Sequence, residues 1–415
     1  MDARNQQMLS SYGQSAEPDS ASGGLRRSHV YFIFFCWTIF SVFLYSRFST
    51  LGDSLSYLTG AYDEDGTQAR TLVITKIAEI VFAVVRNQFL AQLVFSFFAA
   101  TGVGYLIRHA RLHGRYQWPL LAILLIPNFG VWASVIGRES IFVGLVGFFM
   151  GAVLGYCRRP AFGQGLLALL CIAGMTFMRA PYGVGMAIFF LLFLVYRSGP
   201  KTGLSIGVQA LLLAFVIPIV LAFAWPYLDL YVTDEVLPKA KGYFTLKSET
   251  TRAWIEMQTT ADLLSSLWWS LPLALVGPTP GEVMARPVML PFFASGLVVL
   301  GSFLHSVGVA FRAPAGLERK ILLLGWLPAV AFILIAYVPF GIYNSGSAIR
   351  YASCFLLFLI FPSMLLSAMS AETAARRFAP AADLGDDVRR VLRTGTTPSV
   401  ALEGRTGVIP GSQTR

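Results

Sequence analysis

Long apolar runs constrain the fold of this chain more than any other feature of its sequence. A helix that crosses the hydrocarbon core of a bilayer needs about 20 predominantly apolar residues. Only 13% of the residues are charged and 55% are hydrophobic, whereas about a quarter of a soluble domain is charged. The sequence therefore predicts an all-α polytopic membrane protein with about ten transmembrane helices. The runs cover residues 30–46, 88–107, 119–136, 140–156, 163–178, 182–196, 204–225, 288–311, 321–342 and 351–369.

Short basic segments between the runs indicate the orientation. Cytoplasmic loops of membrane proteins carry an excess of lysine and arginine. Placing all four basic segments in the cytoplasm gives ten crossings with both termini inside. The segments are RHARLHGR (108–115), CRRP (157–160), RSGPK (197–201) and RAPAGLERK (312–320).

The same excess explains the net charge of +10 without a nucleic-acid partner, for which no motif is present. Cys36, Cys171 and Cys354 lie within apolar runs and Cys157 at the end of one, so no disulfide is expected. Glycines within the runs, as in GVGYLI (102–107), favour close packing between membrane helices.

The distribution of apolar and polar residues predicts three regions. Residues 1–29 are expected to form a disordered cytoplasmic tail, residues 30–369 the transmembrane domain, and residues 370–415 a mostly disordered cytoplasmic tail. Within the transmembrane domain, 47–87 is the first periplasmic loop and 226–287 a large periplasmic loop.

One stretch of the first loop has a helical pattern of its own. In TLVITKIAEIVFAVVR (71–86), Lys76, Glu79 and Arg86 recur on one face, opposite apolar residues. A helix with one charged and one apolar face is typical of a helix that lies in the membrane surface. We therefore expect an amphipathic interface helix here.

Ionisable residues gather in the turns on the predicted outer face. Asp53 follows the first run, Arg138 and Glu139 lie between the third and fourth, Arg179 between the fifth and sixth, and Arg350 just before the last. Each residue alone also fits a helix end or a side chain that reaches the interface. Positive charge is normally sparse on this face, so the set together indicates a shared outward-facing site.

The residue types at this site indicate its chemistry. Arginine binds phosphate with paired hydrogen bonds, so Arg138, Arg179 and Arg350 are the expected contacts to a lipid-linked phosphate. Asp53 is the expected general base for an attacking hydroxyl, and Glu139 is expected to orient the neighbouring Arg138. These roles predict sugar transfer from a polyprenyl carrier. The supporting candidates are Tyr182, Asn344 and Tyr351.

The stretches LGDSLSYL, WASVIGRESIFVG, RAPYG and NSGSAIRYASCF resemble those of bacterial membrane glycosyltransferases of the GT-C type and related polysaccharide-polymerase-like proteins of envelope biosynthesis. The resemblance implies a GT-C-like bundle with an interface helix in the first outer loop. It also implies that Asp53 is the catalytic base or a metal-linked acid. The polymerase-like proteins use outward-facing arginines for the carrier phosphate, which Arg138, Arg179 and Arg350 resemble.

The chain departs from the GT-C pattern in its acids. Ser54 follows Asp53 where those enzymes have a second acid. The candidates for a second acid are Asp63, Glu64 and Asp65, ten or more residues later. Dependence on a divalent metal therefore stays open, and no other cofactor is predicted.

The leading hypothesis is a glycosyltransferase of the bacterial inner membrane that uses a polyprenyl-(pyro)phosphate-linked sugar on the periplasmic face. Its product would be a cell-envelope polysaccharide or glycolipid. A polymerase or ligase of O-antigen or exopolysaccharide repeat units is the alternative within enzymes. A flippase for lipid-linked saccharides and a non-catalytic scaffold are alternatives from other classes. The expected partners are membrane lipids, the polyprenyl-linked saccharide and other polysaccharide-assembly proteins, with no nucleic acid.

Overall fold

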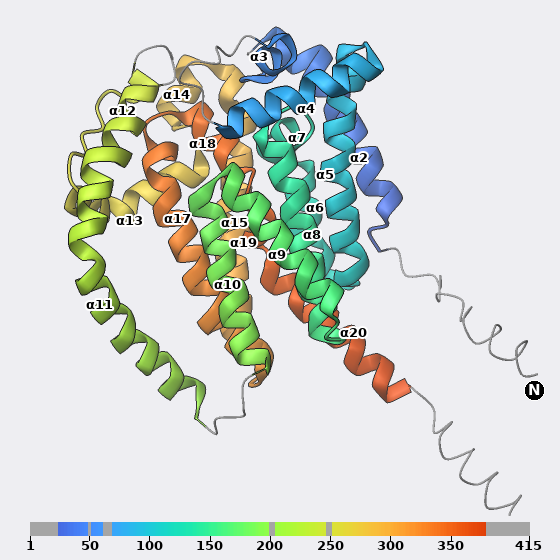
Figure 1. The fold of residues 1–415 in the computed structure, drawn as a ribbon, viewed down its shortest axis with the longest axis vertical. Helices are drawn as coiled ribbons and strands as arrows, with labels where there is room; N and C mark the ends of the chain where they lie inside the picture. Colours follow the sequence, from blue (N-terminus) through green and yellow to red (C-terminus); the bar gives the residue numbers. More distant parts are fainter. Residues whose placement is uncertain (1–23, 49–50, 61–68, 199–203, 246–250, 379–415) are drawn as a thin grey trace, which may run out of the picture. The chain divides into compact units, whose positions relative to one another are not determined.

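The computed structural model describes residues 24–48, 51–60, 69–198, 204–245 and 251–378 (Figure 1). Within these ranges the regular elements are all helical, apart from one isolated bridge between Thr251 and Asn344. The chain is an all-α membrane protein, as its apolar runs predict. The predicted tails 1–29 and 370–415 lie largely outside the described residues, so their disorder stays a prediction.

Six helical segments of the described chain are long and apolar enough to cross a membrane. Three shorter apolar helices accompany them, so the predicted number of about ten crossings and the orientation stay predictions. The six are Arg27–Arg47, which begins with α2 (Arg27–Ile39); α5 (Gln88–Ala110); α8 (Arg138–Arg158); α10 (Ala180–Ser198); Pro287–Arg312, which includes α15 (Leu290–Arg312); and Leu317–Ile342, which ends with α17 (Leu327–Ile342). The shorter ones are α9 (Phe162–Met178), part of α11 (Ile206–Tyr231) and the start of α20 (Phe361–Phe378).

Two of the predicted continuous helices are wrong. The run 119–136 divides into α6 (Trp118–Leu125) and α7 (Pro127–Ala133), because the residue before a proline is disfavoured in the helical region. Ile126 accordingly has extended backbone angles, with φ −86° and ψ 141°. The run 351–369 overlaps the end of α18 (Ser345–Ala352), and then contains α19 (Leu356–Leu359) and the start of α20.

Most of the described residues of the predicted large outer loop 226–287 are helical, and its place on the outer side stays a prediction. It contains the end of α11, then α12 (Leu237–Thr245), α13 (Thr260–Val276) and α14 (Pro280–Ala285). Helix α13 packs against α15, α17 and α18, so this segment is part of the bundle.

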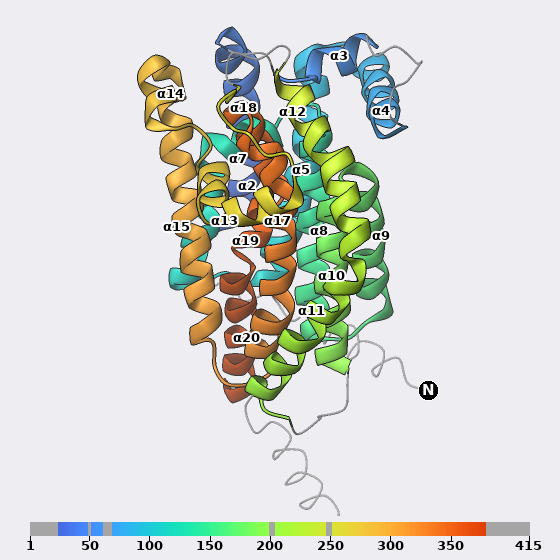
Figure 2. The same cartoon turned by 90° about the vertical axis from the view of Figure 1, so that its left-hand side faces the viewer.

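The interface helix of the first loop is present as a helix, α4 (Ala69–Val85), and the short helix α3 (Ser54–Thr59) packs against it. Lys76 and Glu79 form an exposed ion pair on its surface, with 3.0 Å between Nζ and Oε2. Figures 1 and 2 show α3 at the same end of the bundle as α14 and α18. This end is called the α3–α18 end below. The position of α4 at a membrane surface stays a prediction.

Helices α5 and α8 approach each other at glycines. A Cβ placed on Gly102 would collide with the backbone of Gly144, and one on Gly147 would collide with the backbone of Gly102. The close packing predicted from GVGYLI is confirmed at Gly102. The two helices therefore pack backbone against backbone along this contact.

Replacing Gly147 with leucine will lower the melting temperature of the purified protein, because neither backbone can yield to the new side chain. The expected cost is at the upper end of the roughly 1–3 kcal/mol typical of overpacking. Gly301→Leu is the matched control, since a Cβ on this membrane-helix glycine meets nothing within 4 Å. Equal melting temperatures for the two variants, measured by size exclusion after heating, would contradict this account of the interface.

Candidate functional site

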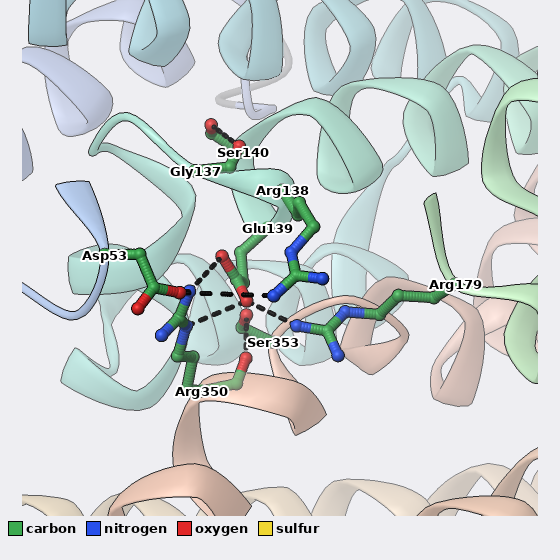
Figure 3. Close-up of polar contacts among 8 residues, drawn as sticks. All are labelled: Asp53, Gly137, Arg138, Glu139, Ser140, Arg179, Arg350 and Ser353. Carbon is green, nitrogen blue, oxygen red and sulfur yellow. Dashed lines mark hydrogen bonds and ion pairs between the residues drawn. The ribbon is translucent and has the colours of Figure 1, made fainter. Parts of the chain in front are cut away.

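Five charged side chains from four segments of the chain meet at the α3–α18 end (Figure 3). Asp53 precedes α3, Arg138 and Glu139 begin α8, Arg179 lies between α9 and α10, and Arg350 belongs to α18. The sequence predicts that these five residues share one site, and the structure brings them together. We call them the charge cluster. Their chemical roles stay predictions.

Glu139 lies at the centre of the charge cluster. Its Oε1 accepts hydrogen bonds from Nη2 of Arg179 at 2.5 Å and from Nε of Arg350 at 2.9 Å. Its side chain is only 3% exposed, and it lies in the first turn of α8, where the helix dipole favours a negative charge. Glu139 therefore neutralises and orients Arg179 and Arg350, whereas the sequence predicted that it would orient its neighbour Arg138.

Arg350 joins Glu139 to the second carboxylate of the charge cluster. Its Nη2 donates to Oδ2 of Asp53 at 2.8 Å, while its guanidinium lies 5.5 Å from the centre of the Trp132 ring. The backbone of Gly52 makes this approach possible. Its φ of +59° is in the left-handed region, and a Cβ there would lie 2.7 Å from Nη1 of Arg350.

The charge cluster retains hydrogen-bonding capacity for a further acceptor. Nη2 of Arg138 is 4.0 Å from Oδ2 of Asp53, and among the described residues no acceptor is hydrogen-bonded to the Arg138 guanidinium. The Nε atoms of Arg138 and Arg179 are both buried without a partner in the described chain. Three arginines facing two acids carry a formal charge of +1. The excess positive charge and the Arg138 guanidinium suit an anion.

Asp53 differs from the other members of the charge cluster in its exposure. Its side chain is 28% exposed, whereas those of the three arginines are 11–13% exposed. Although Asp53 is the N-cap residue of α3, its carboxylate makes no capping hydrogen bond. Within the described residues only Oδ2 is engaged, by Arg350. Oδ1 is therefore available to a ligand.

The supporting candidates lie at different distances from the charges. The guanidinium of Arg179 stacks over the Tyr351 ring at 4.0 Å, and Asn344 caps α18 by accepting from the Ser347 N–H at 2.8 Å. Tyr182 instead packs its ring against Phe142 and Phe355. Its backbone N–H donates to the carbonyl of Arg179 at 3.0 Å, but no described hydrogen bond joins its side chain to the charge cluster.

The remaining acid candidates and the metal question have no structural answer in the charge cluster. Asp63, Glu64 and Asp65 lie outside the described residues. Within the described part of the chain, no group of three or more His, Cys, Asp or Glu side chains is arranged to hold a metal ion.

An ion pair outside the charge cluster, formed by a buried arginine, was not predicted from the sequence. Arg252 is 2% exposed and donates from Nε and Nη2 to the carboxylate of Glu282 at 3.0 and 2.8 Å. Its Nη1 donates to the carbonyl of Ile342 at 3.0 Å, and Nη2 also bonds to the carbonyl of Gly277. The pair therefore ties α14 to the end of α17, directly before α18 and its Arg350.

The Arg252–Glu282 pair makes stability depend on pH. Burial alone would raise the pKa of Glu282, but hydrogen bonds from Arg252 and the Thr279 backbone, with the Arg252 charge, hold it below its ordinary value of 4.5. A lowered folded-state pKa stabilises the protein above pH 4.5, and this stability is lost as the pH falls through the folded-state value.

Glu282→Gln will therefore melt below the wild type by a constant margin above about pH 6. The margin will shrink as the pH falls below 4.5, where the unfolded chain takes up the proton first, and it will vanish below the lower folded-state pKa of Glu282. Thermal unfolding of both proteins at each pH across this range measures the difference between their melting temperatures. A margin that stays constant into strong acid would show that the carboxylate charge does not stabilise the fold.

No family model, curated protein or solved structure matches this chain. The resemblance to GT-C enzymes and polymerase-like proteins therefore stays a prediction.

Proposed function

We propose that this protein is a membrane glycosyltransferase that takes a sugar from a polyprenyl-(pyro)phosphate carrier. The observation that supports it is the charge cluster, in which three arginines and two carboxylates from four segments converge at one end of a membrane helix bundle. The proposal places this end on the periplasmic side of the bacterial inner membrane, with ten crossings and α4 in the membrane surface. The product is a cell-envelope polysaccharide or glycolipid.

The arginines suit the phosphate of such a carrier. Arg138 has donors that no described residue occupies, and Arg179 has a buried Nε with no partner among the described residues. Donors fixed in advance stabilise charge that develops on a leaving group, because they need no rearrangement during the reaction. When the bond between the anomeric carbon and the phosphate oxygen breaks, the electron pair stays on that oxygen, beside the arginines.

Asp53 suits the other half of the reaction. A general base must reach the proton that it removes, and Asp53 is the most exposed acid of the charge cluster, with Oδ1 unengaged among the described residues. It accepts the proton of the acceptor hydroxyl while the oxygen of that hydroxyl bonds to the anomeric carbon. Glu139 is only 3% exposed and already accepts from two arginines, so its role is to orient them.

Asp53→Asn will stop transfer, because an amide cannot accept the proton, while the protein still inserts. The test uses a strain that lacks the gene and is complemented with each variant. Mass spectrometry then measures the lipid-linked saccharides that accumulate. Glu79→Gln is the matched control, since Glu79 is an exposed acid in the helix that packs against α3.

Other outcomes of the same experiment identify the alternatives. If Asp53→Asn keeps activity while Arg179→Ala loses it, a repeat-unit polymerase or ligase replaces the proposed transferase. If purified protein in vesicles moves a labelled carrier across the bilayer without covalent change, the protein is a flippase. Normal product in both Asp53→Ala and Arg350→Ala strains would remove the enzyme proposal altogether.

A further inference from the structure

One buried amide connects the two sides of the charge cluster. Gln92 belongs to α5 and its side chain is fully buried. Its Nε2 donates to Oγ of Ser54 at 2.7 Å, and its Oε1 accepts from the backbone N–H of Ile136. Ser54 directly follows Asp53, and Ile136 lies two residues before Arg138.

From this arrangement we propose that Gln92 is a positioning residue that sets the place of Asp53 relative to Arg138 and Glu139. The effect on catalysis rests on the proposed function, whereas the effect on geometry does not. Nothing in the apolar pattern of α5 requires a glutamine at this position. A fully buried amide is costly unless its donor and acceptor are both satisfied, and Gln92 satisfies each with a residue next to the charge cluster.

The two hydrogen bonds also fix the direction of the amide. The backbone N–H of Ile136 can only donate, so the oxygen of Gln92 faces it and the NH₂ group faces Ser54. A rotated amide would place two donors against each other. The Gln92 amide therefore has a single orientation. This orientation fixes the distance between the start of α3 and the turn before α8.

Helix α3 depends on such a connection because it is short. It contains six residues, fewer than an isolated helix needs to be stable in water. Its other links to the charge cluster and to the rest of the bundle include the Asp53–Arg350 hydrogen bond, the longer Asp53–Arg138 ion pair, the buried ring of Tyr57 and packing on α4. Among the described hydrogen bonds, the one from Gln92 places α3 relative to α5, which is itself packed on α8 at glycines.

The matched control lies one helical turn along the same face of α5. Ser96 is also buried, at 1% exposed, but it bonds to Thr38 of α2 at 2.8 Å and not to the charge cluster. Ser96→Ala therefore removes a buried hydrogen bond of α5 without touching α3. Gln92→Leu removes both bonds of Gln92 at similar volume, and Gln92→Asn keeps the amide but shortens its reach.

The first measurement is independent of any activity. Spin labels at Leu55 on α3 and Leu170 on α9 are both at sites 61% exposed, in a chain whose four native cysteines are replaced. Electron–electron resonance gives the distribution of the distance between them. We expect a narrow distribution for the unmutated chain and Ser96→Ala, and a broad one for Gln92→Leu and Gln92→Asn.

The second measurement is the transfer reaction. A misplacement of about 1 Å can cost about 100-fold in rate, so Gln92→Leu should lose about that factor in kcat. The KM for the carrier should change little, because Glu139 still orients Arg179 and Arg350. Ser54→Ala added to Gln92→Leu should cause no further loss, since both changes break the same bond.

The outcomes separate this inference from the proposed function. A narrow distance distribution in Gln92→Leu overturns it, and so does a broad distribution with undiminished kcat. If the unmutated protein transfers no sugar, the proposed function fails. The distance distributions then still decide whether Gln92 places α3.

Discussion

Replacing Glu139 with glutamine will sharply lower the melting temperature of the protein. Glu139 is the buried counterion of Arg179 and Arg350, and removing one partner from a buried ion pair typically costs about 3–5 kcal/mol, because the remaining charge stays buried. The melting temperature in detergent, followed by size exclusion after heating, measures the loss. Glu79→Gln is the control, because its exposed pair is worth at most about 1 kcal/mol.

A second change tests whether charge is the cause. Adding Arg179→Met to Glu139→Gln removes one of the uncompensated arginines, so the double variant should melt above Glu139→Gln alone. If it melts lower, the two changes remove packing and not an excess of positive charge. If Glu139→Gln and Glu79→Gln have the same melting temperature, Glu139 is not the counterion that its hydrogen bonds indicate.

In the proposed transferase, Arg350→Lys will fold but will lose most of the transfer activity. Arg350 contacts both carboxylates at once, from Nε to Glu139 at 2.9 Å and from Nη2 to Asp53 at 2.8 Å. Lysine keeps the charge but has a single ammonium group and no planar fork, so it cannot hold both acids in this geometry. We expect a loss of about 100-fold, the scale of a misplaced catalytic group.

The control for this prediction is Arg47→Lys, in an exposed arginine at the end of the first apolar segment. Steady-state transfer with equal amounts of membrane-inserted protein compares the two. Full activity in Arg350→Lys would mean that positive charge alone is needed at this position and that the bridge to Asp53 has no part in the reaction.

The residues of the charge cluster could be chosen from the sequence for a specific physical reason. Basic cytoplasmic segments predict which turns face outward, and arginines in the outward turns are then unexpected enough to need a common explanation. Hydropathy gives only the order of helices along the chain, and it does not give their neighbours in the membrane plane. The hydrogen bond between Asp53 and Arg350, almost three hundred residues apart, therefore became visible only in the structure.

Other features of the structure could not be predicted from the sequence. Gln92 is one neutral residue in an apolar run, and the pair of Arg252 and Glu282 joins two residues thirty positions apart in what reads as a polar loop. Tyr182 follows Arg179 by three residues, yet the helix turns its ring toward Phe142 and Phe355. Averaged hydropathy also misses the interruption before Pro127, because it does not register the local effect of a proline on the backbone.

The glycine contact between α5 and α8 has a consequence for how a substrate would enter and leave. Gln92 lies in α5 and Glu139 in α8. These two helices are in backbone contact at Gly102 and Gly147, so we expect little sliding or tilting between them. We therefore expect α5 and α8 to keep a fixed relative position. We expect the movements that admit and release a ligand to occur in the short helix α3, which Asp53 directly precedes, and in α18, which contains Arg350.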